Sequence, residues 1–366
     1  MKKPTTKQIT RIKNLNNKER KSSKSRYNSI SRLKRNIETI KFSEKLSLFV
    51  PKERDRIVTL AQAVELGTPN KYFLNFSDVE VLNPLTALYI THTLDRYPDV
   101  KFHAKFCKAV IPRAVFKLLG INKNFSLGDI NKSNYHTYVD DWNIFSGVDG
   151  DLPEATTEHF KKMKELFEDK NAFFKLFNAI MEAINNVKQH AYHGSSYKKW
   201  FMLTHVSEKN DRNSKSISVV VSDLGVSVPY TAPKTFAERF SGSLAKHISA
   251  FFEEVGLVAE KKIDTAEELR SFNDTKLIKI ATRLHSTSTN SEGRGKGFSD
   301  ILDLVESAKK YKEIESVTTH VLSRYGSYVY KAYPDGTSKE VTLKDGLKDF
   351  DNQIKGTVIS WTIQFT

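Results

Sequence analysis

Hydrophobic positions along the chain recur either in short runs typical of strands or at the spacing of a helix. The changes from one pattern to the other predict the secondary-structure elements. Over the first third, short apolar runs typical of strands alternate with patterns of helical spacing. Asn83 followed by Pro84 is typical of a helix start, and Gly67 and Gly120 are typical of helix ends. Strands are predicted at 45–51, 71–82 and 100–106, and helices at 52–67, 83–98 and 109–120. This order predicts a small β-α-β-α domain over residues 41–125.

A polar stretch with few periodic apolar positions, residues 126–154, predicts a connector to a second unit that covers residues 155–366. Two helices, 154–170 and 171–193, open this unit. The second helix is predicted to bury a stripe formed by Phe174, Phe177, Ile180, Met181, Ile184 and Val187. Residues 226–290 have mostly helical patterns, at 236–256 and 265–285, and predict a long insert. A further helix is predicted at 295–310, and strands at 198–208, 216–223, 314–323, 327–333 and 356–365.

The charge of the chain is concentrated at its N-terminal end. The formal net charge is +15, but residues 1–40 hold 13 basic and two acidic residues, whereas the other 326 residues hold 45 basic and 41 acidic ones. A tail of this composition attracts nucleic acid or an acidic partner through salt-sensitive contacts. The alternative is a disordered, solubilising arm. Residues 26–40 also have enough helical spacing to predict a short helix that leads into the fold.

Other features of the composition bear on the compartment. The chain has one cysteine, Cys107, so an internal disulfide framework is excluded, as expected in a reducing environment. No apolar run approaches the roughly 18 residues that a membrane span needs. The basic N-terminal residues are not followed by an apolar segment, which is not the pattern of a secretory signal. We therefore expect a soluble, cytoplasmic protein without a membrane partner.

Three segments carry candidate chemistry. In the helix EAINNVKQHAY, the residues Glu182, Asn186 and His190 recur every four positions and share one face; alone, such a line is typical of the edge of a buried helix. In SISVVVSDLGVSVP, a buried strand ends at Asp223, which can accept a hydrogen bond from a ligand, and Gly225 follows. Alone, this is a common strand-to-turn aspartate.

The third segment is EGRGKGFSDILDLVES, in which glycines alternate directly before an amphipathic helix. Backbone N–H groups in such a loop, together with the helix N-terminus, suit phosphate oxygens. The spacing is neither that of a P-loop nor that of a dinucleotide-binding fingerprint.

Taken together and in this order, ExxxNxxxHAY, DLGVSVP and GRGKGF resemble the N box and the two glycine boxes of the GHKL (Bergerat-fold) ATP-binding superfamily. The likeness is greatest to the anti-sigma-factor serine kinases, and it covers roughly residues 155–366. The resemblance implies a Bergerat-type α/β sandwich, a mixed sheet covered by helices, that binds ATP and Mg²⁺. The final strand, GTVISWTI, looks like the last strand of the family, with Thr357 in the place of its adenine-side threonine.

The resemblance also implies roles for individual residues. Glu182 would be the general base, and Asn186 would coordinate Mg²⁺ and touch the phosphates. Asp223 would accept the adenine amino group, and Gly225 would let the base lie close. His190 and Asn185 receive no clear role. The expected lid residues are Ser286, Thr287 and Ser288, and the expected phosphate loop is Gly293, Arg294, Gly295, Lys296 and Gly297.

The chain departs from the pattern of the family at two places. Ser227 stands where the first glycine box usually has its second glycine, so the adenine-side loop is expected to be altered. The insert at 226–290 is also longer than a typical kinase lid, and it would close over nucleotide or meet a partner.

The first domain has a fainter resemblance to the STAS-type anti-sigma-antagonist domains, carried by KYFLNFSDVEVLNPLTALYI. Phosphorylated members have a serine near the start of that helix, whereas this chain has Thr86. Either Thr86 is modified instead, or the domain is only a docking module. The alternative is a small α/β domain of another kind.

The function expected from these resemblances is a GHKL ATPase that acts as a nucleotide-controlled switch on a protein partner. One alternative is a serine/threonine protein kinase of the anti-sigma type, which shares every nucleotide residue. Another is a nucleic-acid-binding or protein-binding module with ATP as a structural ligand, in which the basic tail binds nucleic acid. A homodimer is compatible with the resemblance.

Overall fold

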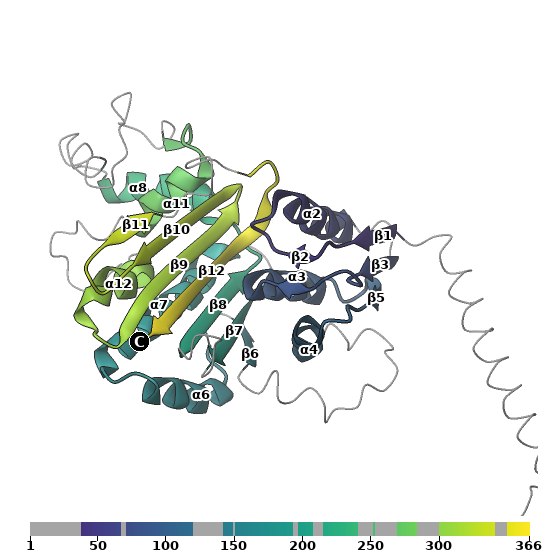
Figure 1. Cartoon of the computed structure of the whole chain (residues 1–366). Helices are drawn as coiled ribbons and strands as arrows, with labels where there is room; N and C mark the ends of the chain where they lie inside the picture. Colours follow the sequence, from purple (N-terminus) through teal and green to yellow (C-terminus); the bar gives the residue numbers. More distant parts are fainter. Residues whose placement is uncertain are drawn as a thin grey trace, which may run out of the picture.

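The chain folds as a mixed α/β protein with both parallel and antiparallel strand pairs (Figure 1). The computed structural model describes residues 38–66, 71–119, 142–148, 151–192, 197–207, 215–240, 252, 269–283, 300–340 and 350–366. The described part contains eight α-helices: α2 (Pro51–Leu66), α3 (Pro84–Arg96), α4 (Val110–Leu118), α6 (Glu154–Glu165), α7 (Lys170–Asn186), α8 (Val228–Phe240), α11 (Asp274–Arg283) and α12 (Asp300–Ser307). None of these helices is long and apolar enough to cross a bilayer.

A seven-stranded sheet forms the centre of the molecule, in the order β11-β10-β9-β12-β8-β7-β6. Its strands are β6 (Trp142–Val148), β7 (Lys199–Ser207), β8 (Ser216–Asp223), β9 (Ile314–Arg324), β10 (Gly326–Ala332), β11 (Ser338–Glu340) and β12 (Ile354–Phe365). The resemblance predicts a mixed sheet, but every strand pair in this sheet is antiparallel. The strands β8 and β9 are both antiparallel to β12, which lies between them, so β8 and β9 run parallel to each other. The helices α8, α11 and α12 form the crossover that joins these two strands.

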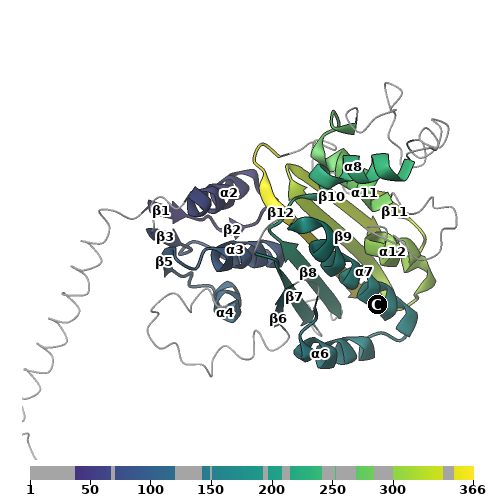
Figure 2. The same ribbon diagram turned by 180° about the vertical axis from the view of Figure 1, so that it is seen from behind.

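One face of the large sheet is covered by α7, α12 and α6 (Figure 2). The helix α7 begins at Asp169, whose side chain accepts a hydrogen bond of 2.8 Å from the N–H of Asn171. Of the predicted stripe, Ile180, Ile184 and Val187 are buried, whereas Phe177 and Met181 are only partly buried. Phe173 is buried, whereas Phe174 is 46% exposed. The face in contact with the sheet is formed by Ala172, Phe173, Leu176, Ala179, Ile180, Ala183 and Ile184.

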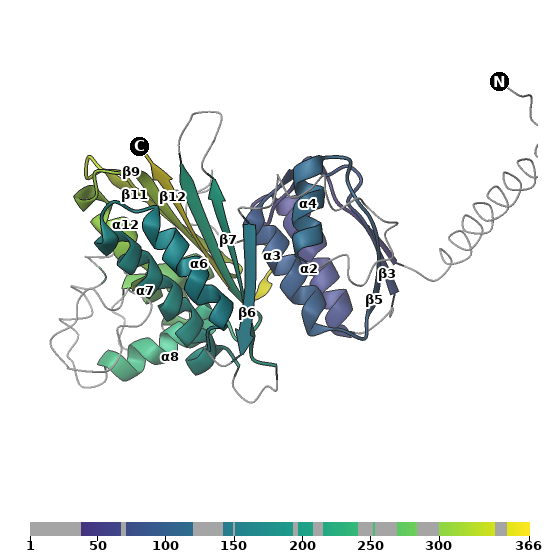
Figure 3. The ribbon, with the colours of Figure 1, turned by 90° about the horizontal axis from the view of Figure 1, so that it is seen from below.

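The N-terminal domain consists of a three-stranded parallel sheet, β1-β3-β5, a two-stranded parallel pair, β2-β4, and the helices α2, α3 and α4. The strands are β1 (Glu38–Lys41), β2 (Lys45–Leu46), β3 (Lys71–Asn75), β4 (Val81–Leu82) and β5 (Lys101–Lys105). The predicted start of α3 is confirmed: the Asn83 side chain accepts from the N–H of Thr86 at 3.2 Å, and Pro84 occupies the first turn. The three helices lie between the small sheet and the large one (Figure 3).

Two predicted boundaries are wrong. Residues 38–40, assigned to the tail and to a short helix, belong to β1, which pairs in parallel with β3. Residues 142–148, assigned to the connector, form β6, which pairs with β7 at the edge of the large sheet. Both segments lie at the edges of their sheets, where each pairs with one neighbouring strand only. The predicted helix over 26–37 and most of the predicted insert lie outside the described residues.

The two domains share one hydrophobic core. The helix α3 is buried along most of its length, and apolar residues of the small domain cluster with Val220, Leu224 and Val358 of the large sheet. The fully buried guanidinium of Arg54 donates to the backbone carbonyls of Arg324, at 2.6 Å, and Asn352, at 2.9 Å. Hydrogen bonds from a buried charged donor to fixed carbonyls hold the two parts in one relative position.

Four histidines are expected to make the protein sensitive to acid. Burial lowers the pKa of His159, His205 and His320 to about 4, and that of His92 well below 6.5. Between pH 6.5 and 4 the unfolded chain therefore binds more protons than the folded one, so stability falls as the pH falls. His205 and His320 are each expected to contribute a loss of about 1.5 kcal/mol between pH 6.5 and 5. Urea denaturation of the protein across this range measures the loss.

The control for this prediction compares a half-buried histidine, His320, with an exposed one, His103. His320→Gln is expected to make the dependence of the unfolding free energy on pH less steep. His103→Gln, at an exposed position, is expected to leave that dependence unchanged. Equal slopes in the two variants would contradict the assignment of the acid sensitivity to buried imidazoles.

Candidate functional site

Two of the three polar residues predicted to share a face of α7 are described, and they lie together. Glu182 and Asn186 are both half-buried at the border of the buried stripe, and the Asn186 amide donates to Glu182 Oε1 at 3.3 Å. Directly after Asn186 the helix widens into a π-helical turn, Val187–Ala191. Such turns are frequent at functional sites because they displace side chains from the regular helical positions. The backbone of His190 lies in this turn, and its side chain lies outside the described residues.

The strand-end aspartate and the threonine of the last strand are brought face to face. Asp223 at the end of β8 is paired in register with Thr357 of β12. On both strands the odd-numbered neighbours, such as Val221 and Ile359, belong to the core that contains α7. Because side chains alternate along a strand, Asp223 and Thr357 both point toward the α7 side of the sheet.

The carboxyl group of Asp223 is buried and hydrogen-bonded, and its pKa is raised. It is 8% exposed, and it accepts hydrogen bonds from the N–H of Gly225, at 2.8 Å, and from the N–H of Thr357. Burial raises the pKa of this carboxyl to about 7, although the two hydrogen bonds act in the opposite direction. Near neutral pH the group can therefore accept a hydrogen bond from a ligand as a carboxylate, or donate one as an acid.

The turn after Asp223 is fixed to the end of α7. The hydroxyl of Tyr192 accepts from the N–H of Leu224 and donates to the carbonyl of Lys199, both at 2.8 Å. The carbonyl of Ala191 accepts from the N–H of Val226 at 2.5 Å. A Cβ atom at Gly225 would lie 2.0 Å from that carbonyl oxygen. Only glycine fits at position 225, because the backbone there packs against Ala191 at the end of the helix. The sequence motif explains Gly225 differently, by the close approach of a ligand.

The turn is also held by Ser323, a residue that was not predicted to take part in the site. Ser323 of β9 is fully buried; its hydroxyl accepts from the N–H of Val228 at 3.1 Å and donates to the carbonyl of Gly356 at 3.0 Å. The same hydroxyl lies 3.0 Å from the hydroxyl of Thr357. Ser227 has an ordinary backbone conformation, because only Arg324 among the described non-glycine residues has a positive φ. The serine in place of the second glycine therefore causes no strain.

Gly356 is a second glycine that the site requires. Its φ is +72°, and a Cβ atom there would lie 2.1 Å from the carbonyl oxygen of Asp223. Gly356→Ala is expected to cost about 1–2 kcal/mol for the left-handed backbone and about 1–3 kcal/mol more for the steric overlap. Gly336 is a matched control, with φ +82° and open space around it, so Gly336→Ala should cost only the first amount. Urea denaturation compares the two, and equal losses would contradict the close contact.

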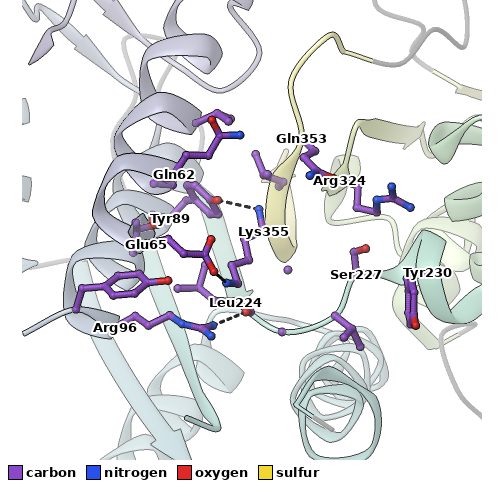
Figure 4. Close-up of a pocket in the computed structure, with 18 residues that line it drawn as sticks. Gln62, Glu65, Tyr89, Arg96, Leu224, Ser227, Tyr230, Arg324, Gln353 and Lys355 are labelled. Atoms are coloured by element: carbon purple, nitrogen blue, oxygen red, sulfur yellow. Dashed lines mark hydrogen bonds and ion pairs between the residues drawn. The ribbon is translucent and has the colours of Figure 1, made fainter. Parts of the chain in front are cut away.

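A separate pocket of about 330 Å³ lies behind the same turn, between the two domains (Figure 4). It is lined by residues of α2 and α3 and by the segments 224–227 and 353–356. The guanidinium of Arg96 donates to the carbonyl of Leu224 at 2.7 Å, and the hydroxyl of Tyr89 accepts from the N–H of Lys355 at 3.0 Å. Of the described residues predicted to bind nucleotide, only Gly225 lines this pocket. The N-terminal domain therefore supports the turn from the side opposite to α7.

The remaining predicted residues lie outside the described part of the chain. These are the lid residues Ser286, Thr287 and Ser288 and the phosphate-loop residues Gly293, Arg294, Gly295, Lys296 and Gly297. The helices that flank them are described: α11 packs against α8 and β10, and α12 packs against α7. The first turn of α12 is attached to the sheet, since the indole N–H of Trp361 donates to the carbonyl of Ile301 at 2.9 Å.

A metal held entirely by protein groups is not a feature of the described residues. No group of three or more His, Cys, Asp or Glu side chains gathers in that part of the chain. The amide oxygen of Asn186 is a hard ligand suited to Mg²⁺, an ion that commonly takes one or two protein ligands and completes its shell with substrate phosphates and water. The donor set therefore fits a metal that arrives with a phosphate ligand.

Comparison with models of known protein families gives no match, and comparison with curated proteins gives no significant match. The class that the fold defines is thus a mixed α/β protein, in which a parallel three-stranded domain is packed on a seven-stranded antiparallel sheet. Its function has to be argued from the site itself.

Proposed function

We propose that the chain is a magnesium-dependent ATP-binding protein of the GHKL type, which hydrolyses ATP and uses its nucleotide state to switch a protein partner. The observation that carries this proposal is the pairing of Asp223 with Thr357 on the α7 side of the sheet. A carboxyl group and a hydroxyl group at adjacent strand ends suit the amino edge of an adenine ring. Asp223 would accept a hydrogen bond from the amino group of adenine, and Thr357 would line the same side of the adenine site.

The position of Glu182 and Asn186 near the end of α7 also supports the proposal, because it suits contact with the phosphates of ATP. Ala191, five residues after Asn186, is hydrogen-bonded to the turn that follows Asp223. Asn186 and Glu182 therefore lie on the helix that borders the adenine side of the proposed site. They precede the contact with the turn by about one and two helical turns. Asn186 would hold Mg²⁺, whose charge neutralises phosphate oxygens when it is bound. Glu182 would orient and deprotonate the attacking water, and Lys296 and Arg294 would supply positive charge to the phosphates.

The architecture is compatible with the resemblances that suggested this function. A sheet covered on one face by α6, α7 and α12 is a feature that a Bergerat-type sandwich would share, although the strand pairs of this sheet are all antiparallel. The three-stranded parallel sheet with its helices agrees with a STAS-like domain. The proposal therefore includes both fold assignments, together with a lid formed by the insert at 226–290.

The burial of Thr86 bears on the kinase alternative. Its side chain is fully buried, and its hydroxyl oxygen accepts from the N–H of Leu48 at 2.8 Å. A hydroxyl in this position is inaccessible to a phosphate donor, so Thr86 is a poor candidate for modification within the folded chain. We therefore favour a switch ATPase, with a kinase acting on another protein as the second candidate.

Incubation with γ-labelled ATP tests the proposed function. We expect saturable binding of a non-hydrolysable ATP analogue that weakens when EDTA removes Mg²⁺, and release of labelled phosphate without labelling of the protein. Transfer of label to a partner would favour the kinase. Absence of analogue binding with and without Mg²⁺ would reject the nucleotide site.

A further inference from the structure

The small parallel sheet has an outer face that points away from the rest of the protein. Ile40, Tyr72, Leu74 and Phe102 are buried toward the helices α2, α3 and α4. Since neighbouring side chains on a strand point to opposite faces, the residues between them point outward. Figure 3 shows the helices on the inner side of the small sheet only. The outer face is formed by Thr39, Lys41, Lys71, Phe73, Asn75, Lys101, His103 and Lys105.

The register of the strands arranges these residues in rows. Phe73 lies in the middle strand, directly between Thr39 and His103. One row away Lys71 is paired with Lys101, and on the other side Asn75 lies between Lys41 and Lys105. An aromatic ring and an imidazole ring at the centre are therefore bordered by lysines at both ends of the sheet.

Phe73 is not explained by the packing of the protein. It is partly exposed and packs against neither of the two hydrophobic clusters, although it is a large apolar side chain in the centre of a sheet. His103 beside it is exposed. Strands lie about 4.8 Å apart, so side chains on adjacent strands present neighbouring ring faces on one surface. Rings in this arrangement are suited to stacking with flat, unpaired bases.

The charges of the outer face are largely available to a partner. Lys41 forms an ion pair of 2.8 Å with Asp78, in which both side chains are at least half-exposed. Within the described part of the chain, Lys71, Lys101 and Lys105 make no such pair. The 37 residues that precede β1 add 13 basic residues and one acidic residue, and they join the sheet at Glu38. The face and the segment that enters it therefore share one sign of charge.

We propose that the outer face of the small sheet binds single-stranded nucleic acid, with Phe73 and His103 stacking on bases and the surrounding lysines contacting phosphates. An anionic membrane surface would bind the lysines, but its headgroups have no flat ring that could stack on Phe73 and His103. This inference is independent of the nucleotide site on the large sheet, because no residue is common to the two.

Fluorescence anisotropy of the full-length protein, in the absence of ATP, tests the proposal. The probes are labelled oligothymidine and oligouridine about 12 nucleotides long, a duplex of the same length, and vesicles of anionic lipid. Phe73→Leu is expected to weaken binding of a single strand about tenfold, whereas Phe73→Tyr, which keeps the ring, is expected to bind like the wild type. The two single strands show whether DNA or RNA is preferred.

A matched pair of charge variants separates the lysines of the outer face from lysines elsewhere on the surface. Lys71→Gln with Lys101→Gln is expected to lower the slope of log affinity against log salt by about 1.4. Lys309→Gln with Lys310→Gln removes the same charge from an exposed site elsewhere and should leave the slope unchanged. Thermal denaturation verifies that each variant is folded. The proposal is overturned if no single strand binds, if the duplex or the vesicles bind better, or if both double variants and Phe73→Leu bind like the wild type.

Discussion

Glu182→Gln is expected to bind Mg²⁺ and ATP with nearly normal affinity but to hydrolyse ATP about 100- to 10,000-fold more slowly. The substitution keeps the oxygen that accepts from the Asn186 amide at 3.3 Å, so the helix and the neighbouring ligand should stay in place. It removes the negative charge that would take a proton from the attacking water. Phosphate release under saturating ATP measures the rate, and analogue binding measures the affinity.

Two further variants test whether the slow hydrolysis is specific to the loss of the Glu182 carboxylate. Glu165→Gln, at an exposed position at the end of α6, is expected to hydrolyse ATP at the wild-type rate. Asn186→Ala is expected to lose the Mg²⁺-dependent part of binding, a defect different in kind from that of Glu182→Gln. Normal hydrolysis by Glu182→Gln would show that another group is the general base, even if nucleotide binding itself is retained.

Asp223→Asn is expected to have two opposite effects, since it should stabilise the empty protein and weaken its binding of nucleotide. Burial raises the pKa of Asp223 to about 7 from an ordinary value of 3.8, so the folded chain holds this proton more tightly than the unfolded chain. Stability is therefore lost as the pH rises through this range, by up to about 4 kcal/mol above pH 7. The neutral amide avoids this cost, and its oxygen can still accept from the N–H of Gly225.

The loss of affinity follows from the hydrogen bond that the carboxylate would accept from adenine. A hydrogen bond to a charged group contributes about 1.5–3 kcal/mol, so nucleotide binding should weaken about 10- to 150-fold. Thermal denaturation at pH 5 and pH 8.5 and analogue titration at pH 8.5 measure the two effects. Asp335→Asn, at an exposed turn, is the control and should change neither. A variant no more stable than the wild type at pH 8.5 would contradict the buried, costly carboxylate.

Much of the fold could be predicted because the local pattern and the tertiary environment agree. The run of β-branched residues before Asp223 forms a strand buried on both faces, and Asn83 with Pro84 starts a helix as expected. The error in the stripe of α7 has a simple cause: apolar residues occur on two adjacent helical lines, and only contact with the sheet decides between Phe173 and Phe174. Propensity alone cannot make that choice.

The site was only partly predictable for a similar reason. The family resemblance implies that Asp223 and Thr357 both lie on the adenine side of the site, and the structure pairs them in register. Tyr192, Ser323 and Gly356 were missed as supporting residues, because each acts on a segment distant in the sequence. The tyrosine was visible in the first motif, but its hydrogen bond to Leu224 depends on how the helix end meets the turn.

The shared core between the domains has a consequence for how the chain comes apart. Arg54 is buried against the carbonyls of Arg324 in β9 and of Asn352 just before β12, and Val220, Leu224 and Val358 are covered by the small domain. Cutting the chain between residues 126 and 154 would leave these apolar side chains in water on one fragment, and a buried guanidinium without its acceptors on the other. The segment where the sequence suggests a border is therefore a connection inside one cooperative unit, which is expected to melt in a single heat-absorption peak.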